Sequence, residues 1–214
     1  MSKVRFQQTI SLDGYSAGPD QSEEYPLGAG GEELHEWMFG LEAWRKAHGD
    51  EGGEVNASTP VVEQLESGYG AIVMGRNMFG PIGGGDWGDG SWKGWWGDNP
   101  PYHTPVFVLT HHAREPVEME GDTTFHFATD GIESAIEQAR AAAGDEDVLI
   151  AGGANTIQQA LAAGLVDEFL LSVVPRLLGD GERPLDGVEA ELELEQLEAI
   201  EAPGVTHLKY RVVK

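Results

Sequence analysis

The chain has 214 residues, no cysteine, and 37 acidic against 13 basic side chains, which give a formal net charge of −24. This length can bury the core of one domain, and the lack of cysteine excludes disulfides, thiolate metal sites and a cysteine nucleophile. A surface this acidic repels phosphate backbones and anionic lipids. We therefore expect neither nucleic acid nor a membrane as a partner. The acidity fits either a halophile's solvated surface or a biased genome. No apolar run approaches the roughly 18 residues of a membrane span, and we expect a soluble cytoplasmic protein.

Apolar patterning, turns and helix caps predict the elements of the first part of the chain. In chain order they are a strand at residues 4–10, a helix at residues 32–47, a helix from Ser58 or Thr59 to about Ser67, and a strand at residues 71–74. The first helix is predicted because apolar side chains recur there at three- and four-residue spacing. The second begins with an N-cap residue, and Pro60 follows in its first turn.

A long loop is predicted at residues 80–101, where glycines, two consecutive prolines and four of the six tryptophans occur. Loops of this length are usually functional or disordered, and so many aromatic side chains argue against disorder. The loop either walls off an aromatic, uncharged substrate or packs rigidly against a partner subunit or the first helix.

The rest of the chain alternates apolar strands with helices. Strands are predicted at residues 106–109, 124–127, 148–150, 168–174, 191–200 and 205–213, and helices at residues 130–143, capped by Asp130, and 156–163, ended by Gly164. This alternation is typical of a largely parallel sheet with helices on both faces, and the last two strands add an antiparallel edge. We expect one α/β domain that spans residues 1–214.

Three predicted strands end in turns suited to an anionic ligand, at residues 75–77, 110–114 and 152–156. Ligands of open α/β sheets bind beyond the carboxyl ends of the strands, where turns and helix N-termini present backbone N–H groups. Taken alone, a Gly-Gly turn is more often a packing feature, and an arginine after a strand is more often a surface residue. Two of the eight arginines nevertheless gather at these ends of an acidic chain, which favours an anionic ligand.

The turns lack the G-x-G-x-x-G fingerprint of ordinary dinucleotide-binding domains. At the same residues the chain resembles the dihydrofolate reductase-like superfamily, in particular the branch with the C-terminal reductase domain of the bifunctional riboflavin-biosynthesis deaminase-reductase. The matching segments occur in family order and span nearly the whole chain. They are residues 10–15 (ISLDGY), 72–79 (IVMGRNMF), 106–110 (VFVLT), 148–154 (VLIAGGA) and 165–175 (LVDEFLLSVVP).

The resemblance implies a three-layer fold with helices on both faces of a mostly parallel sheet, and an NADPH-dependent reductase. It implies that the loop at residues 11–17 closes near the nicotinamide and that Arg76 is the expected partner of the 2′-phosphate. The cofactor-binding residues that it implies are Gly75, Arg76 and Asn77 at the adenosine phosphate end, Thr110 and His111 near the adenine-side ribose, and Gly152, Gly153, Ala154, Asn155 and Thr156 under the pyrophosphate.

The substrate side departs from the pattern of dihydrofolate reductases proper. These enzymes place a buried carboxylate in the first helix, before a Trp-Phe pair, whereas here that position falls on Leu34, with Glu33 one residue away. One residue turns a helical side chain by about 100°, which argues against folate reduction. Asp13 and Glu33 remain candidate catalytic acids, although an Asp before Gly is more often only a turn residue. The expected substrate-binding residues are Ser11, Trp37 and Ser172.

We therefore expect hydride transfer from NADPH to a small pteridine-like or pyrimidine-like heterocycle. One alternative is the 5-amino-6-(5-phosphoribosylamino)uracil reductase of riboflavin biosynthesis, which would need basic residues for a ribose phosphate. Another is a non-catalytic nucleotide-binding protein on the same fold. Histidines without helical spacing make a weak metal pattern, so no metal is expected. The two tail strands leave a sheet edge to be covered, which suggests a homodimer.

Overall fold

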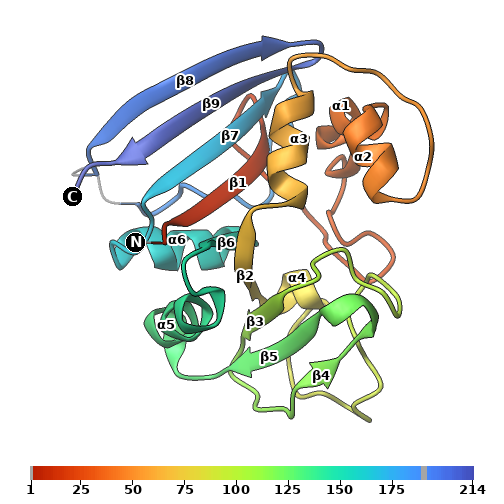
Figure 1. Ribbon diagram of the computed structural model, residues 1–214, viewed down its shortest axis with the longest axis vertical. Helices are drawn as coiled ribbons and strands as arrows, with labels where there is room; N and C mark the ends of the chain where they lie inside the picture. Colours follow the sequence, from red (N-terminus) through yellow and green to blue (C-terminus); the bar gives the residue numbers. More distant parts are fainter. Residues whose placement is uncertain (1, 189–191) are drawn as a thin grey trace.

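The computed structural model describes residues 2–188 and 192–214, in which nine strands form one sheet (Figure 1). The strands are β1 (Val4–Ser11), β2 (Tyr69–Gly75), β3 (Pro105–Leu109), β4 (Val117–Glu118), β5 (Thr124–Ala128), β6 (Asp147–Gly152), β7 (Glu168–Val174), β8 (Leu194–Ala202) and β9 (Val205–Val212). Their order across the sheet is β4-β5-β3-β2-β6-β1-β7-β9-β8. The strands from β5 to β7 in this order are parallel, and β4, β9 and β8 are antiparallel to their neighbours.

The sheet confirms the predicted α/β class, with a mostly parallel sheet and antiparallel C-terminal edge strands. Each predicted strand is present, whereas the two-residue β4 was not predicted. The strand predicted from residue 191 begins at Leu194, and Glu191 itself lies outside the described residues. Strand β8 forms one edge of the sheet, as the argument for a homodimer assumes. The homodimer itself stays a prediction.

Helices lie on both faces of the sheet (Figure 1). They are α1 (Glu36–Phe39), α2 (Glu42–Ala47), α3 (Thr59–Glu66), α4 (Arg76–Phe79), α5 (Gly131–Ala143) and α6 (Ala154–Ala162), with 3₁₀ turns at Glu32–Leu34 and Glu120–Asp122. The longest, α5, has 13 residues, and no helix in the described part of the chain is long and apolar enough to cross a membrane.

The single helix predicted over residues 32–47 is wrong, because the chain breaks there into a 3₁₀ turn, α1 and α2. Leu41 is extended, with φ −75° and ψ 141°. Glu54 pairs with this break, since its N–H donates to the Gly40 carbonyl at 2.8 Å and its carbonyl accepts from the Glu42 N–H at 2.9 Å. Leu41 thereby packs in a core cluster with Met38. The apolar residues that predicted one helix are buried together although the helix is interrupted.

The predicted helix ends are partly confirmed. Gly164 follows α6 with φ +66°, as a C-terminal glycine does, but α6 begins at Ala154 rather than Thr156. Neither Ser58 nor Asp130 makes a side-chain capping bond. The Ser58 hydroxyl instead lies 2.8 Å from His207 Nε2, which ties the start of α3 to β9.

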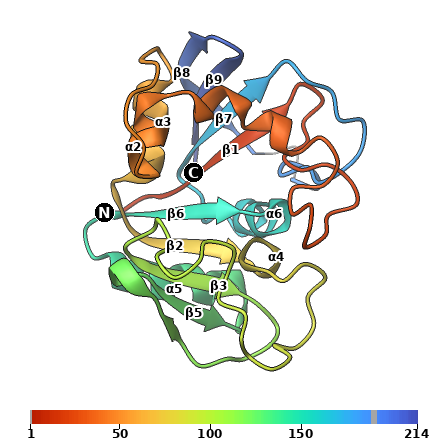
Figure 2. The same cartoon turned by 90° about the vertical axis from the view of Figure 1, so that its right-hand side faces the viewer.

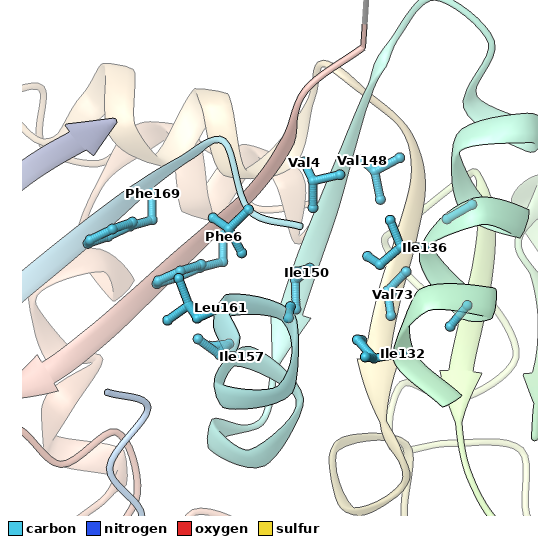
Figure 3. Packing of buried hydrophobic residues seen from close by; sticks show 14 of the residues in the cluster. Val4, Phe6, Val73, Ile132, Ile136, Val148, Ile150, Ile157, Leu161 and Phe169 are labelled. Atoms are coloured by element: carbon cyan, nitrogen blue, oxygen red, sulfur yellow. The ribbon is translucent and has the colours of Figure 1, made fainter. Parts of the chain in front are cut away.

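The main core lies between the sheet and the pair α5 and α6 (Figure 3). Phe6 of β1 stacks on Phe169 of β7, with ring centroids 4.7 Å apart. Side chains alternate along a strand, so Val73 of β2 faces this core while its neighbours Ile72 and Met74 join a second cluster on the opposite face.

The tryptophan-rich loop, defined here as residues 80–104, contains no helix or strand among its residues, all of which are described. It supplies Trp87, Trp92 and Trp96 to the second cluster, where Trp87 and Phe127 lie 4.8 Å apart between ring centroids. The loop is therefore packed on its own sheet. Figure 2 shows α2 and α3 on one side of β6, and β2, β3 and this loop on the other.

Candidate functional site

A cleft of about 850 Å³ crosses the carboxyl ends of the parallel strands. One part, the turn half, consists of the turns that follow β2, β3 and β6. The other part, the strand half, lies beyond β6 in the sheet order and is lined by Gln7 and Thr9 of β1, Ser172 of β7, and Trp37, Val62 and Leu65 from the covering helices. The edge of the tryptophan-rich loop also lines the cleft.

The turn between β6 and α6 occupies the middle of the cleft. Gly152 has φ +133°, and Gly153 precedes the first residue of α6. A Cβ added to Gly153 would meet no atom within 4 Å, so its backbone borders open space. Ala154, Asn155 and Thr156 form the first turn of α6 and line the cleft. The first N–H groups of a helix lack intrahelical partners and attract anions, so this turn suits a phosphate.

The turn after β2 lies against the same helix. A Cβ on Gly75 would come within 2.5 Å of Thr156 Oγ1, so glycine is what lets the end of β2 approach α6. Asn77 is exposed and lines the cleft beside it. The predicted glycine turns of β2 and β6 are therefore brought together at one place.

Arg76 follows Gly75 and lies between the cleft and the tryptophan-rich loop. Its Nη1 donates to the carbonyls of Gly80 and Pro81, and its guanidinium lies over the Trp87 ring, 3.9 Å from the centroid. Its Nε and Nη2 are buried without a hydrogen-bond partner. One side of the guanidinium thus holds the loop, and two donors on it remain unsatisfied.

The turn after β3 places Thr110 and His111 in the cleft wall. Thr110 is buried, and its Oγ1 accepts from the His112 N–H at 3.1 Å, whereas His111 is exposed. Arg114 points elsewhere, since it donates to the carbonyls of Trp92 and Gly90, both at 2.7 Å. Both arginines of the predicted anion site therefore bind loop carbonyls.

The candidate acid Asp13 lies outside the cleft, and so does Ser11. Ser11 Oγ donates to Asp13 Oδ1 at 2.6 Å, and the N–H groups of Leu178 and Gly179 donate to the same carboxylate at 3.1 and 2.8 Å. The Ser11 bond, followed by these backbone bonds, lowers the pKa of Asp13 to about 2. Asp13 thus ties the end of β1 to the segment after β7, and so acidic a carboxyl is a poor proton donor at neutral pH.

Glu33 and its neighbour Leu34 also point away from the cleft. Glu33 lies 3.1 Å from Arg176 Nη1 in an exposed ion pair, and Leu34 is fully buried in the core against Val174 and Val205. Of all the described residues that line the cleft, Glu182 alone carries a carboxylate. The strand half therefore lacks an acid at the position where dihydrofolate reductases proper have one.

Trp37 and Ser172, both predicted, lie together in the strand half. Trp37 Nε1 is buried and has no hydrogen-bond partner. Ser172 Oγ lies 2.8 Å from Nδ1 of His207, whose Nε2 reaches Ser58 Oγ at the same distance. The Trp37 and His207 rings lie edge to face, with their centroids 4.9 Å apart and an angle of 66° between their planes.

Comparison with known proteins shows the family to which the chain belongs. Residues 2–207 match the RibD C-terminal domain family. The chain belongs to this family. No curated protein sequence matches the chain. Membership of the RibD C-terminal domain family supports the predicted reductase, and of the two expected substrate classes, pteridine-like and pyrimidine-like, it supports a pyrimidine.

Solved structures share the fold at low identity. A candidate riboflavin biosynthesis protein from Shewanella sp. PV-4 is 21% identical over 99% of both chains, with a TM-score of 0.65. The diaminohydroxyphosphoribosylaminopyrimidine deaminase/5-amino-6-(5-phosphoribosylamino)uracil reductase of Thermotoga maritima is 14% identical with a TM-score of 0.59, over 99% of this chain and 57% of its own. Dihydrofolate reductase from Enterococcus faecalis, complexed with NADP(H), is 11% identical over 99% of this chain and 97% of its own, with a TM-score of 0.50. The dihydrofolate reductase-like fold is confirmed.

Sequence reasoning missed several residues of this RibD C-terminal domain that line or support the cleft. Gln7 and Thr9 are polar residues in a strand buried between two parallel neighbours, where apolar runs are usual. These polar residues in a buried strand could have been recognised in the sequence as candidates for the cleft lining. No local signal marks His207, because its partners Ser58 and Ser172 lie 149 and 35 residues away in sequence.

We predict that Asp13→Asn lowers the melting temperature at pH 7 and leaves substrate reduction largely intact. The folded pKa of Asp13 is below its unfolded value, so the carboxylate stabilises the fold above the unfolded pKa, near 3.9, and this contribution disappears as pH falls through about 2. The gap in melting temperature between wild type and variant should therefore narrow on acidification, as measured by circular dichroism. An unchanged melting temperature together with abolished reduction would instead identify Asp13 as a proton donor.

Proposed function

We propose that this chain is an NADPH-dependent reductase that transfers a hydride to a small pyrimidine-like or pteridine-like heterocycle. Family membership and the fold shared with an NADP(H)-complexed dihydrofolate reductase support this function. The observation that carries it is the open Gly153 backbone at the start of α6, which lies between the arginine-bearing turn and the aromatic strand half.

The residues of the turn half fit NADPH. The open space at Gly153 and the first turn of α6 suit its pyrophosphate, and the unsatisfied Nε and Nη2 of Arg76 are donors for a 2′-phosphate. Gly75, Asn77, Thr110 and His111 line the wall in which the adenosine end would lie. When bound, NADPH supplies the hydride; the protein supplies position.

The strand half would hold the ring that is reduced. Trp37, Val62 and Leu65 give it an apolar wall that excludes water, and Ser172 and Thr9 orient the ring by hydrogen bonds. Because this half lacks an acid at the position where dihydrofolate reductases proper have one, we propose a substrate whose reduction needs no buried acid there, which argues against folate.

A non-catalytic nucleotide-binding protein is the second candidate, favoured by the same lack of an acid. Loss of NADPH absorbance at 340 nm with a panel of pterins, pyrimidines and quinoid compounds separates the two. We expect saturable NADPH consumption with at least one uncharged pyrimidine or pterin. Tight NADPH binding without turnover across the panel would favour the binding protein.

We predict that Gly153→Val weakens NADPH binding by more than about tenfold, because its branched side chain would fill the space that the pyrophosphate needs. Gly40→Val is a matched control: Gly40 also has a negative φ, and a Cβ there also meets nothing within 4 Å, yet it lies outside the described cleft lining. Fluorescence titration of both variants, with circular dichroism to verify folding, measures the effect. A folded Gly153→Val variant that binds NADPH like wild type would make the turn purely structural.

We predict that Arg76→Ala weakens NADPH by on the order of tenfold and changes NADH affinity little, because only NADPH carries the 2′-phosphate. Arg114→Ala removes the other arginine that binds the tryptophan-rich loop, and it should leave the ratio of the two affinities unchanged. The ratio thus separates phosphate binding from loop support. Equal losses for both cofactors in Arg76→Ala would contradict the assignment.

A further inference from the structure

Charged side chains are nearly absent from the cleft. Among the described residues that line it, Arg76 is the one arginine or lysine, and it lies in the turn half with Nη1 bound to loop carbonyls. Two arginines lie near the strand half without lining the cleft. Arg176 lies 3.1 and 3.5 Å from Glu33 and Glu36, and Arg183 lies over the Tyr15 ring, with its Nε buried and without a hydrogen-bond partner. Among the described residues, no arginine or lysine lines the strand half to compensate the dehydration of a phosphate in a chain of net charge −24.

The histidine that lines this part of the cleft does not change that balance. His35 lines this part of the cleft, and burial lowers its pKa, which favours the neutral ring. Its Nδ1 lies 3.3 Å from the Gly31 carbonyl. The strand half therefore offers aromatic surface and neutral hydrogen-bonding groups.

Trp37 provides the first of these neutral groups. Its indole N–H is buried without an acceptor although the residue lines the cleft. A buried donor without a partner is unfavourable, and a ligand carbonyl would satisfy it. A ring carbonyl, such as that of a pyrimidine, is the matching chemical group.

Ser172 provides the second group, and its orientation is set from behind. His207 is 1% exposed and lies between Ser172 and Ser58, 2.8 Å from each hydroxyl. Burial lowers the pKa of His207 to about 4, so the ring is neutral, with one donor nitrogen and one acceptor nitrogen. Each tautomer assigns Ser172 a single role toward His207, which fixes what its hydroxyl offers to the cleft.

We infer that the strand half binds an uncharged heterocycle without a phosphate, held by Trp37 Nε1 and by a Ser172 hydroxyl that His207 orients. This rests on the proposed function and names its substrate class. His207 is a positioning residue, because it acts through Ser172. The inference separates this chain from the reductase activity of the Thermotoga maritima protein, whose substrate carries a ribose phosphate.

The substrate class is tested with two probes that differ only in the phosphate: 5-amino-6-(5-phosphoribosylamino)uracil and its dephosphorylated nucleoside. Each is titrated without oxygen into protein saturated with NADP⁺, and binding is measured by calorimetry at low salt. We expect the nucleoside to bind at least about tenfold more tightly. Tighter binding of the phosphorylated probe overturns the inference, and so does failure of the nucleoside and of 5,6-diaminouracil to bind. A chain that fails to bind NADP⁺ or NADPH overturns the proposed function instead.

The role of His207 is tested by a double-mutant cycle on nucleoside affinity. His207→Phe and Ser172→Ala should each weaken binding by about tenfold, and the double variant should be no weaker than either. His207→Asn keeps a polar atom near the Nδ1 position and should restore part of the loss, while NADP⁺ affinity should change much less than nucleoside affinity in all variants. Additive losses, or an equal loss of NADP⁺ affinity, would mean that His207 only supports the fold. If His207→Phe does not fold, His207→Asn with Ser172→Ala completes the cycle.

Discussion

The parallel pairing of β6 with β2 on one side and β1 on the other is the constraint on which the cleft depends. Val148 of β6 aligns with both Val4 and Ala71, so three strands from distant parts of the sequence end at one edge. The Gly152–Gly153 turn lies at the centre of that edge. The arginine-bearing turn reaches it from β2, and the polar side chains of β1 and β7 reach it from the opposite direction. A one-residue shift in either register would turn the side chains of the shifted strand to the opposite face and so change what lines the cleft.

One face of β1 and β7 packs in the main core, and the opposite face lines the cleft. Phe6 and Phe169 bury one face against α6, where packing alone decides which side chains fit. The other face carries Thr9 opposite Ser172, and His207 lies next in register on β9. Because side chains alternate along a strand, polar groups can enter the cleft without weakening the main core.

Local sequence predicted the strands and the glycine turns because apolar runs and glycines act over a few residues. It failed where distant segments decide the structure. The helix over residues 32–47 is interrupted because Glu54 pairs with the backbone beside Leu41, and no short-range pattern indicates that. The attachment of Arg76 and Arg114 to loop carbonyls was hidden for the same reason. The Asp13-Gly14 pair is typical of a turn, and the sequence indicates that much. The three hydrogen bonds of the Asp13 carboxylate, two of them from residues after β7, are visible only in the folded structure.

The central claim is that one nicotinamide cofactor spans both halves of the cleft, with its phosphates at the start of α6. A crystal structure of the chain with NADP⁺ tests it most directly. We predict the pyrophosphate within hydrogen-bond distance of the backbone N–H groups that follow Gly153, the 2′-phosphate at Arg76 and the nicotinamide toward Ser172. A cofactor bound with its pyrophosphate away from this turn, or with its nicotinamide outside the strand half, would contradict the account.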